Sequence, residues 1–110
     1  VQMADQDGNC RIDGSHFEDV LMARAARRVI VTAERIVDRE VLAADPGRTA
    51  IAGFLVGSVV EAPRGAWPTS CAGLYDYDET IIGEMLAHAG DPEGLRTFVE
   101  GRLLSEPLPV

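Results

Sequence analysis

The chain has 110 residues, enough for one small domain, and carries a formal net charge of −8. Nucleic-acid surfaces need clustered cations to displace the counterions of phosphates, so this charge argues against a nucleic-acid partner. No apolar run approaches the roughly 20 residues of a membrane-spanning helix, so we expect no membrane segment. Cys10 and Cys71 lie far apart and form no Cys-x-x-Cys pair. We therefore expect two thiols in a protein of the reducing cytoplasm.

The N-terminal residues predict a strand, a turn and a returning strand over residues 1–13, with the turn at Asp7-Gly8-Asn9. Because the chain begins in what reads as the middle of a strand, we expect a fold truncated at its N-terminus. Ser15 and Glu18 then form the Ser-x-x-Glu pattern of a capping box, which predicts a helix beginning here. Its expected apolar face consists of Phe17, Val20, Leu21 and Ala25.

The middle of the chain predicts two more strands and a short helix. Residues 29–33 are rich in β-branched side chains without clean alternation, which indicates a strand covered on both faces. Asp38 is placed to cap a short helix over residues 41–44. Residues 51–62 predict a second buried strand, or a pair of short ones, that Pro63 ends.

The C-terminal part predicts an irregular loop over residues 64–78 and then two helices. Asp78 is placed to cap the first helix, expected over residues 79–89, and Asp91 with Pro92 begins the second. The second helix has an expected apolar face of Leu95, Phe98, Val99 and Leu103. We expect one domain over residues 1–104 and a tail over residues 105–110. The order of elements predicts an α/β fold with a partial mixed or parallel sheet and flanking helices.

Two features imitate metal or catalytic sites. From Asp5 to His16 the spacing resembles an EF-hand calcium loop, but Cys10 replaces the glycine of the sixth position and His16 the glutamate of the twelfth. A β-turn is the better interpretation, and we assign no metal ligand. Neither His16 nor His88 has a second ligand at metal-like spacing, and Cys71 has no evident base that would make it a nucleophile.

The loop over residues 64–78 is the candidate site. It follows a predicted strand, and ligands of open α/β sheets gather beyond the carboxyl ends of strands. It holds the single tryptophan and both tyrosines beside carboxylates and a thiol. Such side chains suit a substrate pocket and a subunit interface equally well, and both interpretations stay open. The candidate substrate-binding residues are Trp67, Ser70, Cys71, Tyr75, Asp76 and Tyr77.

Several stretches in a common order resemble one family, the α subunits of glutaconate-type coenzyme A transferases, which includes steroid-ring-opening CoA-thioester hydrolases. The stretches are Val1-Gln2-Met3-Ala4-Asp5, Gly8-Asn9, residues 25–37, Gly53-Phe54-Leu55-Val56, Val59-Val60-Glu61-Ala62-Pro63, Gly65-Ala66-Trp67-Pro68, Cys71, Gly73-Leu74-Tyr75-Asp76-Tyr77-Asp78 and Asp91-Pro92-Glu93-Gly94.

This resemblance implies a fold like that of ribose-phosphate isomerase, a β-subunit partner in a hetero-oligomer, and an acyl-CoA thioester as substrate with no covalently bound cofactor. In the transferases a glutamate attacks the thioester, and an acyl anhydride and a glutamyl-CoA thioester follow. That glutamate belongs to the β subunit in the glutaconate branch, so no catalytic residue is assigned here. The chain is expected to supply part of the acyl-CoA site of a CoA-transferase and to be inactive alone. Membership in a CoA-thioester hydrolase complex and a non-catalytic interaction module are the alternatives.

Overall fold

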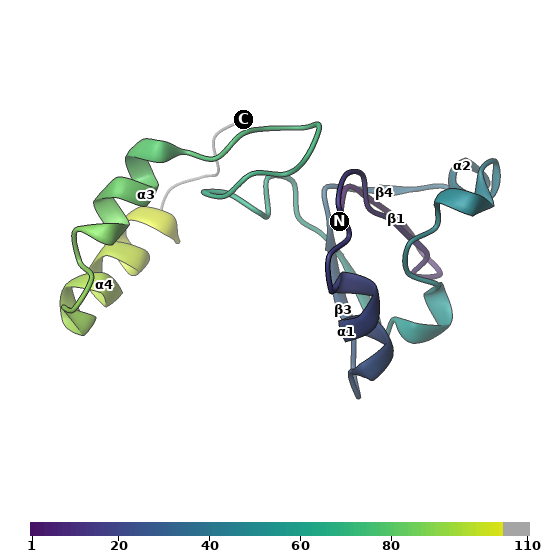
Figure 1. Ribbon diagram of the computed structural model, residues 1–110, viewed down its shortest axis with the longest axis horizontal. Helices are drawn as coiled ribbons and strands as arrows, with labels where there is room; N and C mark the ends of the chain where they lie inside the picture. Colours follow the sequence, from purple (N-terminus) through teal and green to yellow (C-terminus); the bar gives the residue numbers. More distant parts are fainter. Residues whose placement is uncertain (105–110) are drawn as a thin grey trace. The chain divides into compact units, whose positions relative to one another are not determined.

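The computed structural model describes residues 1–104, so the predicted tail over residues 105–110 lies outside the described residues. The chain divides into two compact units, Val1–Gly65 and a second that begins at Ala66. Figure 1 shows the elements of each. The first unit contains β1 (Met3–Asp5), β2 (Cys10–Arg11), α1 (Asp19–Ala25), β3 (Ile30–Ala33), β4 (Arg35–Val37), α2 (Arg39–Ala43), η1 (Pro46–Arg48), η2 (Gly53–Leu55) and β5 (Ser58–Glu61). The second contains α3 (Glu79–Leu86), α4 (Pro92–Phe98) and the π-helical turn η3 (Val99–Leu103).

The strands of the first unit form a three-stranded mixed sheet in the order β2-β1-β4 and a two-stranded parallel sheet of β3 and β5. The Val1 amino group donates to the Thr32 carbonyl at 2.8 Å, and the Glu34 amide donates to the Val1 carbonyl at 3.0 Å. Val1 precedes β1, Thr32 belongs to β3 and Glu34 follows β3. These two bonds therefore link the two sheets. The predicted α/β fold with a partial mixed sheet is confirmed, although β4 was not predicted.

The core of the first unit is built mostly from small side chains. Its buried cluster consists of Ala4, Cys10, Ala23, Val31, Ala33 and Ile51. Ala23 is the buried residue of α1 and the member that this helix contributes to the cluster. The helix therefore joins the core through a single methyl side chain.

The predicted first residue of α1 and the predicted burial of its apolar face are both wrong. The helix starts at Asp19, its N-cap is Glu18, and no side-chain hydrogen bond caps it, so Ser15 does not form the predicted box. Gly14 and Phe17 have positive φ angles of 94° and 36°, and a right-handed helix cannot run through such residues. Phe17 is 84% exposed and Leu21 65% exposed, so the predicted apolar face is not buried within the described residues.

The two middle strands also differ from the prediction. Ile30 of β3 is 71% exposed while Val31 and Ala33 are buried, so only one face of that strand is covered by the described residues. Residues 51–62 do not form one strand: Ile51 makes an isolated bridge to Cys10, η2 follows, and β5 begins at Ser58. This agrees with the alternative of two short extended pieces, separated by a helical turn that the apolar composition did not indicate.

The predicted turn at Asp7-Gly8-Asn9 is confirmed. Asp5 is 1% exposed, and its carboxylate accepts hydrogen bonds from the Asp7 amide at 3.0 Å, the Asn9 amide at 2.9 Å and the Asn9 side-chain nitrogen at 2.9 Å. The Asn9 side-chain oxygen in turn accepts from the Gly53 amide at 2.9 Å. Backbone and side-chain amide donors of the turn thus surround the Asp5 carboxylate, which would be the first calcium ligand of an EF-hand loop.

Both predicted caps of the second unit are confirmed. The Asp78 side chain accepts from the Ile81 amide at 3.1 Å and begins α3, and the Asp91 side chain accepts from the Gly94 amide at 3.0 Å and begins α4. The helix α3 ends at Leu86, before the predicted end at residue 89. In the first unit, Asp38 is the N-cap of α2 as predicted, but its side chain makes no capping hydrogen bond.

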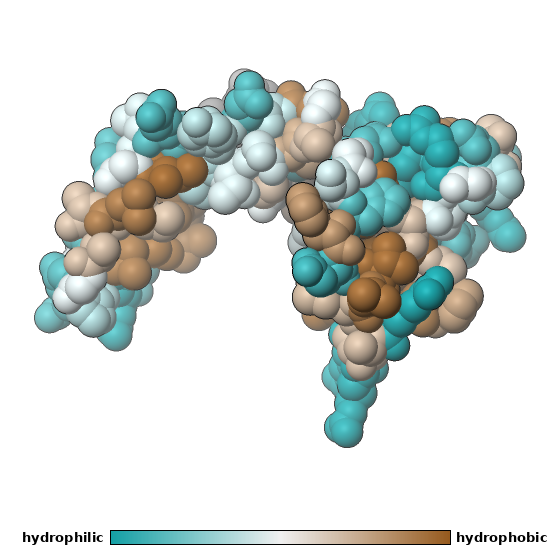
Figure 2. All heavy atoms as spheres, in the orientation of Figure 1, coloured by the Kyte–Doolittle hydropathy of each residue, from teal (hydrophilic) through white to brown (hydrophobic). Residues whose placement is uncertain are grey.

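The second unit buries little apolar surface by itself. Among its described residues Ile81 is the one buried apolar side chain, while Leu86 is 62% exposed and Leu104 75% exposed. Figure 2 shows apolar side chains gathered on the surface of α3 and α4. Because helices of this length depend on tertiary packing for their stability, this surface is suited to contact with other polypeptide.

We expect Gly53→Ala to lower the free energy of unfolding by about 1–3 kcal/mol, the usual cost of overpacking. A Cβ atom at Gly53 would overlap the Asp7 carbonyl oxygen and lie 3.2 Å from the Asn9 amide nitrogen. The matched control is Gly47→Ala, whose new Cβ atom would meet nothing nearer than 3.7 Å. Urea denaturation of both variants measures the difference, and equal stabilities would contradict the close approach.

We expect the stability of the first unit to fall between pH 9 and pH 11 because of Cys10. Burial raises the pKa of this thiol from 9.0 to about 11; the Val1 amino group opposes the shift and the Asp5 carboxylate adds to it. Above pH 9 the unfolded chain loses the thiol proton while the folded chain keeps it, so alkali favours unfolding. Denaturation over this pH range in the parent and in Cys10→Ala measures the effect. An identical slope in the two proteins would show that the thiol is not responsible.

Candidate functional site

The candidate loop closes on itself within the second unit. Cys71 and Tyr75 form an isolated antiparallel bridge in which the Cys71 amide donates to the Tyr75 carbonyl at 3.0 Å. The Leu74 amide donates to the Cys71 carbonyl at 2.9 Å, and Gly73 has a positive φ of 79° that favours glycine. These bonds make residues 71–75 a tight turn and give the backbone a defined conformation.

Side chains fasten the two ends of the loop to each other. The Ala66 amide donates to the Tyr75 hydroxyl at 3.1 Å, and the Trp67 indole N–H donates to the Asp78 carboxylate at 3.3 Å. The Asp78 amide donates to the Pro68 carbonyl at 2.8 Å, and the Trp67–Pro68 peptide bond is cis. Residues at the start of the loop are therefore held by residues at its end.

The structure separates the predicted site residues into two groups. Trp67, Cys71 and Tyr75 are half-buried and belong to the framework of the loop, whereas Ser70, Asp76 and Tyr77 are exposed. The side chain of Tyr77 is the most accessible aromatic group of the loop, at 59% exposed. Among the predicted residues, the hydrogen-bonded bridge brings Cys71 and Tyr75 together. A ligand can reach the exposed group fully and the half-buried group in part.

Asp78 has a second contact that sequence reasoning missed. Its position before a helix identified it as a cap, and one carboxylate oxygen does cap α3. The other oxygen accepts the indole N–H of Trp67, eleven residues earlier. The sequence signal for this contact was the presence of a single indole donor and a carboxylate in one short loop, but nothing in the spacing of the two residues indicates that they meet.

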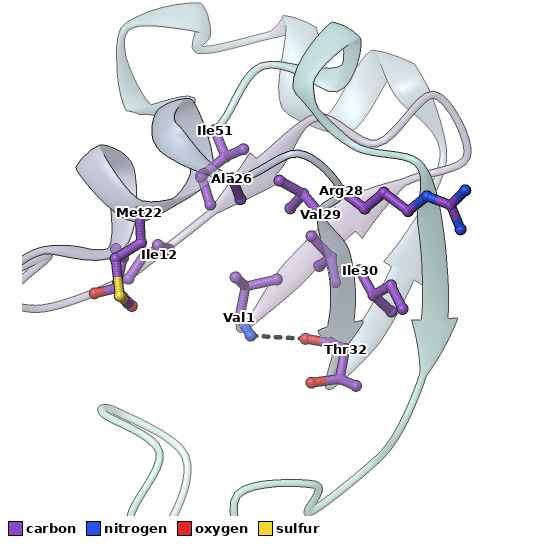
Figure 3. A pocket seen from close by; sticks show the side chains of 12 residues that line it. Val1, Ile12, Met22, Ala26, Arg28, Val29, Ile30, Thr32 and Ile51 are labelled. Atoms are coloured by element: carbon purple, nitrogen blue, oxygen red, sulfur yellow. Dashed lines mark hydrogen bonds between the residues drawn. The ribbon is translucent and has the colours of Figure 1, made fainter.

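The first unit contains a pocket of mixed lining that the sequence did not predict. Its volume is about 340 Å³. Its lining comes from α1, β3, the residues before β1 and after β2, and the segment before η2, and includes Val1, Ile12, Met22, Ala26, Val29, Ile30 and Ile51. Figure 3 shows the apolar side chains of Val1, Val29 and Ile30 beside the Val1–Thr32 hydrogen bond, with the Arg28 guanidinium pointing away from them. Asp19, Arg28 and Thr32 also belong to the lining, so apolar and polar side chains share the pocket.

The two histidines have structural contacts. The His16 ring nitrogen Nε2 lies 3.0 Å from the Ile12 carbonyl oxygen, and the His88 ring packs on Phe98 with 5.5 Å between centroids. Within residues 1–104, no group of three or more His, Cys, Asp or Glu side chains is arranged to hold a metal ion. Both cysteines are free thiols, Cys10 buried and Cys71 half-buried. In the same part of the chain, none of the helices combines the length and apolar character needed to span a membrane.

Comparisons of sequence identify relatives. No protein-family model matches the chain. One of the subunits of the glutaconate CoA-transferase of Acidaminococcus fermentans is 47% identical over 82 residues, which are 74% of this chain and 26% of that subunit. The chain is a homologue of this glutaconate CoA-transferase subunit. An uncharacterized protein of Archaeoglobus fulgidus is 44% identical over 100 residues, 91% of this chain and 22% of that protein.

Solved structures agree with this homology. The glutaconate CoA-transferase of Acidaminococcus fermentans matches 92% of this chain with a TM-score of 0.87 and 40% identity, over 32% of its own chain. A cysteine-to-serine variant of the decarboxylase AibA/AibB matches 96% of this chain with a TM-score of 0.78 and 37% identity, over 37% of its own chain. The chain thus spans between 22% and 37% of the length of these relatives. The family resemblance and the fold predicted from the sequence are both confirmed.

Proposed function

We propose that this chain supplies one wall of the acyl-CoA site of a heteromeric CoA-transferase. The observation that carries the proposal is the 47% identity to a glutaconate CoA-transferase subunit, together with a preformed loop that exposes Ser70, Asp76 and Tyr77. A loop whose ends are fastened by hydrogen bonds presents these side chains at a small cost in conformational entropy. That is the property a binding wall needs.

The exposed side chains suit different parts of an acyl-CoA. An ionised carboxylate accepts hydrogen bonds and does not donate them, so Asp76 fits an ordered water or an amide N–H of the pantetheine arm. It repels a carboxylate on the acyl group. The hydroxyl groups of Ser70 and Tyr77 both donate and accept, so they fit the acyl carboxylate or the thioester oxygen. The half-buried Trp67 offers an apolar ring to the acyl chain.

The proposal requires a second subunit. In the described residues the acidic second unit offers Arg96 and Arg102 as its cations, and Arg102 already pairs with Glu84 at 3.5 Å. The CoA phosphates need more positive charge than this, so cations from outside the second unit must complete the site, and we propose that a partner subunit contributes them. We assign the nucleophilic glutamate to that partner, treat CoA as substrate, and place the complex in the cytoplasm, where Cys10 and Cys71 stay reduced.

A role in a decarboxylase is the second candidate, favoured by the 37% identity and TM-score of 0.78 to the decarboxylase AibA/AibB. The two reactions differ in what leaves. A transferase moves the CoA thiolate to an acceptor acid and releases the donor as a free acid, whereas a decarboxylase keeps the thioester and releases carbon dioxide. No comparison favours the hydrolase or the non-catalytic module over these.

The test is an exchange assay of the chain co-expressed with its partner subunit. With acetyl-CoA as donor and glutaconate as acceptor, we expect glutaconyl-CoA and acetate in equal amounts, and no exchange by either polypeptide alone. In a second reaction that is supplied with glutaconyl-CoA and no acceptor acid, release of carbon dioxide with the thioester kept would select the decarboxylase. Free CoA released without an acceptor would select the hydrolase, and a stable complex that performs none of these reactions would select the interaction module.

We expect Asp76→Asn and Tyr75→Phe each to lower kcat/KM of the complex for acetyl-CoA by about tenfold, or roughly 1.4 kcal/mol, because the first weakens a charge-assisted hydrogen bond and the second removes a hydrogen bond. Asp76→Asn removes the exposed charge, and Tyr75→Phe removes the hydroxyl that accepts from the Ala66 amide. The control is Asp38→Asn, an exposed carboxylate of the first unit with no capping bond. Unchanged kcat/KM in both loop variants would remove this loop from the proposed site.

A further inference from the structure

Asp78 divides its carboxylate between two parts of the second unit. One oxygen accepts the Ile81 amide at 3.1 Å at the beginning of α3, and the other accepts the Trp67 indole N–H at 3.3 Å at the beginning of the loop. Its own amide donates to the Pro68 carbonyl at 2.8 Å, on the residue next to Trp67. A single residue therefore fixes both the backbone beside Trp67 and the direction of the indole ring.

The indole has one polar atom, and that atom is a donor only. Its hydrogen bond to the Asp78 carboxylate turns the N–H edge of the ring toward the beginning of α3. The opposite, apolar edge is thereby turned away from Asp78. Trp67 is half-buried, so part of the residue remains accessible.

We propose that Asp78 is a positioning residue that sets the orientation of the Trp67 ring and, through it, the size of acyl group that the loop accepts. The selectivity part of this inference rests on the proposed acyl-CoA function, whereas the orientation of the ring does not. An apolar wall discriminates between acyl chains by roughly tenfold or more for each methylene it rejects, so a shift of the ring changes the preference between chain lengths.

Asp78→Ser separates the two bonds of the carboxylate. Serine is as good an N-cap as aspartate and keeps the bond to Ile81, but a single short hydroxyl cannot also hold the indole. Asp91→Ser is the matched control, because Asp91 caps α4 through the Gly94 amide in the same way, far along the chain from Trp67. Trp67→Phe removes the indole donor while leaving the cap of α3 unchanged.

Two readouts test the proposal in the complex with the partner subunit. The first is the ¹⁹F NMR resonance of 5-fluorotryptophan at position 67, assigned as the signal absent from Trp67→Phe. The second is the ratio of kcat/KM for butyryl-CoA to that for acetyl-CoA with one acceptor acid. We expect Asp78→Ser to shift the resonance of the residue-67 fluorotryptophan. We also expect it to change the kcat/KM ratio by about tenfold, in the direction in which Trp67→Phe changes that ratio. Asp91→Ser should change neither.

The double variant gives a further criterion. If Asp78 acts through Trp67, adding Asp78→Ser to Trp67→Phe leaves the ratio where Trp67→Phe alone put it. The proposal is overturned by an unmoved resonance in Asp78→Ser, by equal loss of activity toward both thioesters, or by additive effects in the double variant. If no variant or parent protein turns over either thioester, the proposed function fails, and the resonance alone then decides whether Asp78 positions the ring.

Discussion

The fold of the first unit depends on one buried carboxylate. A charge removed from water is costly unless hydrogen bonds surround it, and Asp5 receives three, all from the turn of residues 7–9. These bonds fix Asn9, whose side-chain oxygen holds the Gly53 amide. The turn between β1 and β2 is thereby joined to the segment that leads into β5. Glycine at position 53 is required because the chain passes so close to Asp7 that no side chain fits.

Asp78 uses the same chemistry in the second unit. The carboxylates of Asp5 and Asp78 each accept hydrogen bonds from a backbone amide and from a side-chain N–H of their own unit. Each carboxylate therefore fixes a segment without regular structure. The difference is burial. Asp5 lies inside a core, whereas the second unit buries only Ile81 among its described apolar residues. The exposed apolar surface of α3 and α4 and the uncovered face of β3 fit a polypeptide that completes its core against further protein.

The sequence predicted features that local rules decide. The turn at Gly8, the caps Asp78 and Asp91, and the strand ending at Ala33 follow from spacing and side-chain chemistry within a few residues. The beginning of α1 was predicted wrongly because positive φ angles at Gly14 and Phe17 override the capping pattern of Ser15. β4 was missed because three residues carry too little periodicity to be recognised. The burial of β3 was overestimated because its second face is left uncovered by the described residues.

The sequence predicted which segment forms the candidate site, but it did not predict how the side chains of that segment contact one another. Composition identified the loop and its aromatic and acidic residues, and it placed Trp67, Tyr75 and Asp76 together in one wall. The hydrogen bonds of Trp67 and Tyr75 show that these two form the framework, while Asp76 and Tyr77 are exposed. Contacts such as that between residues 67 and 78 depend on the closed shape of the loop, which no pairwise spacing encodes.

The most direct measurement of the central claim is a crystal structure of the chain in complex with its partner subunit and a bound CoA thioester. The account predicts that the acyl end of the thioester contacts Trp67 and at least one of Ser70, Asp76 and Tyr77, with a glutamate of the partner subunit on the other side of the thioester carbon. A thioester bound elsewhere, with residues 66–78 touching neither the ligand nor the partner subunit, would contradict it.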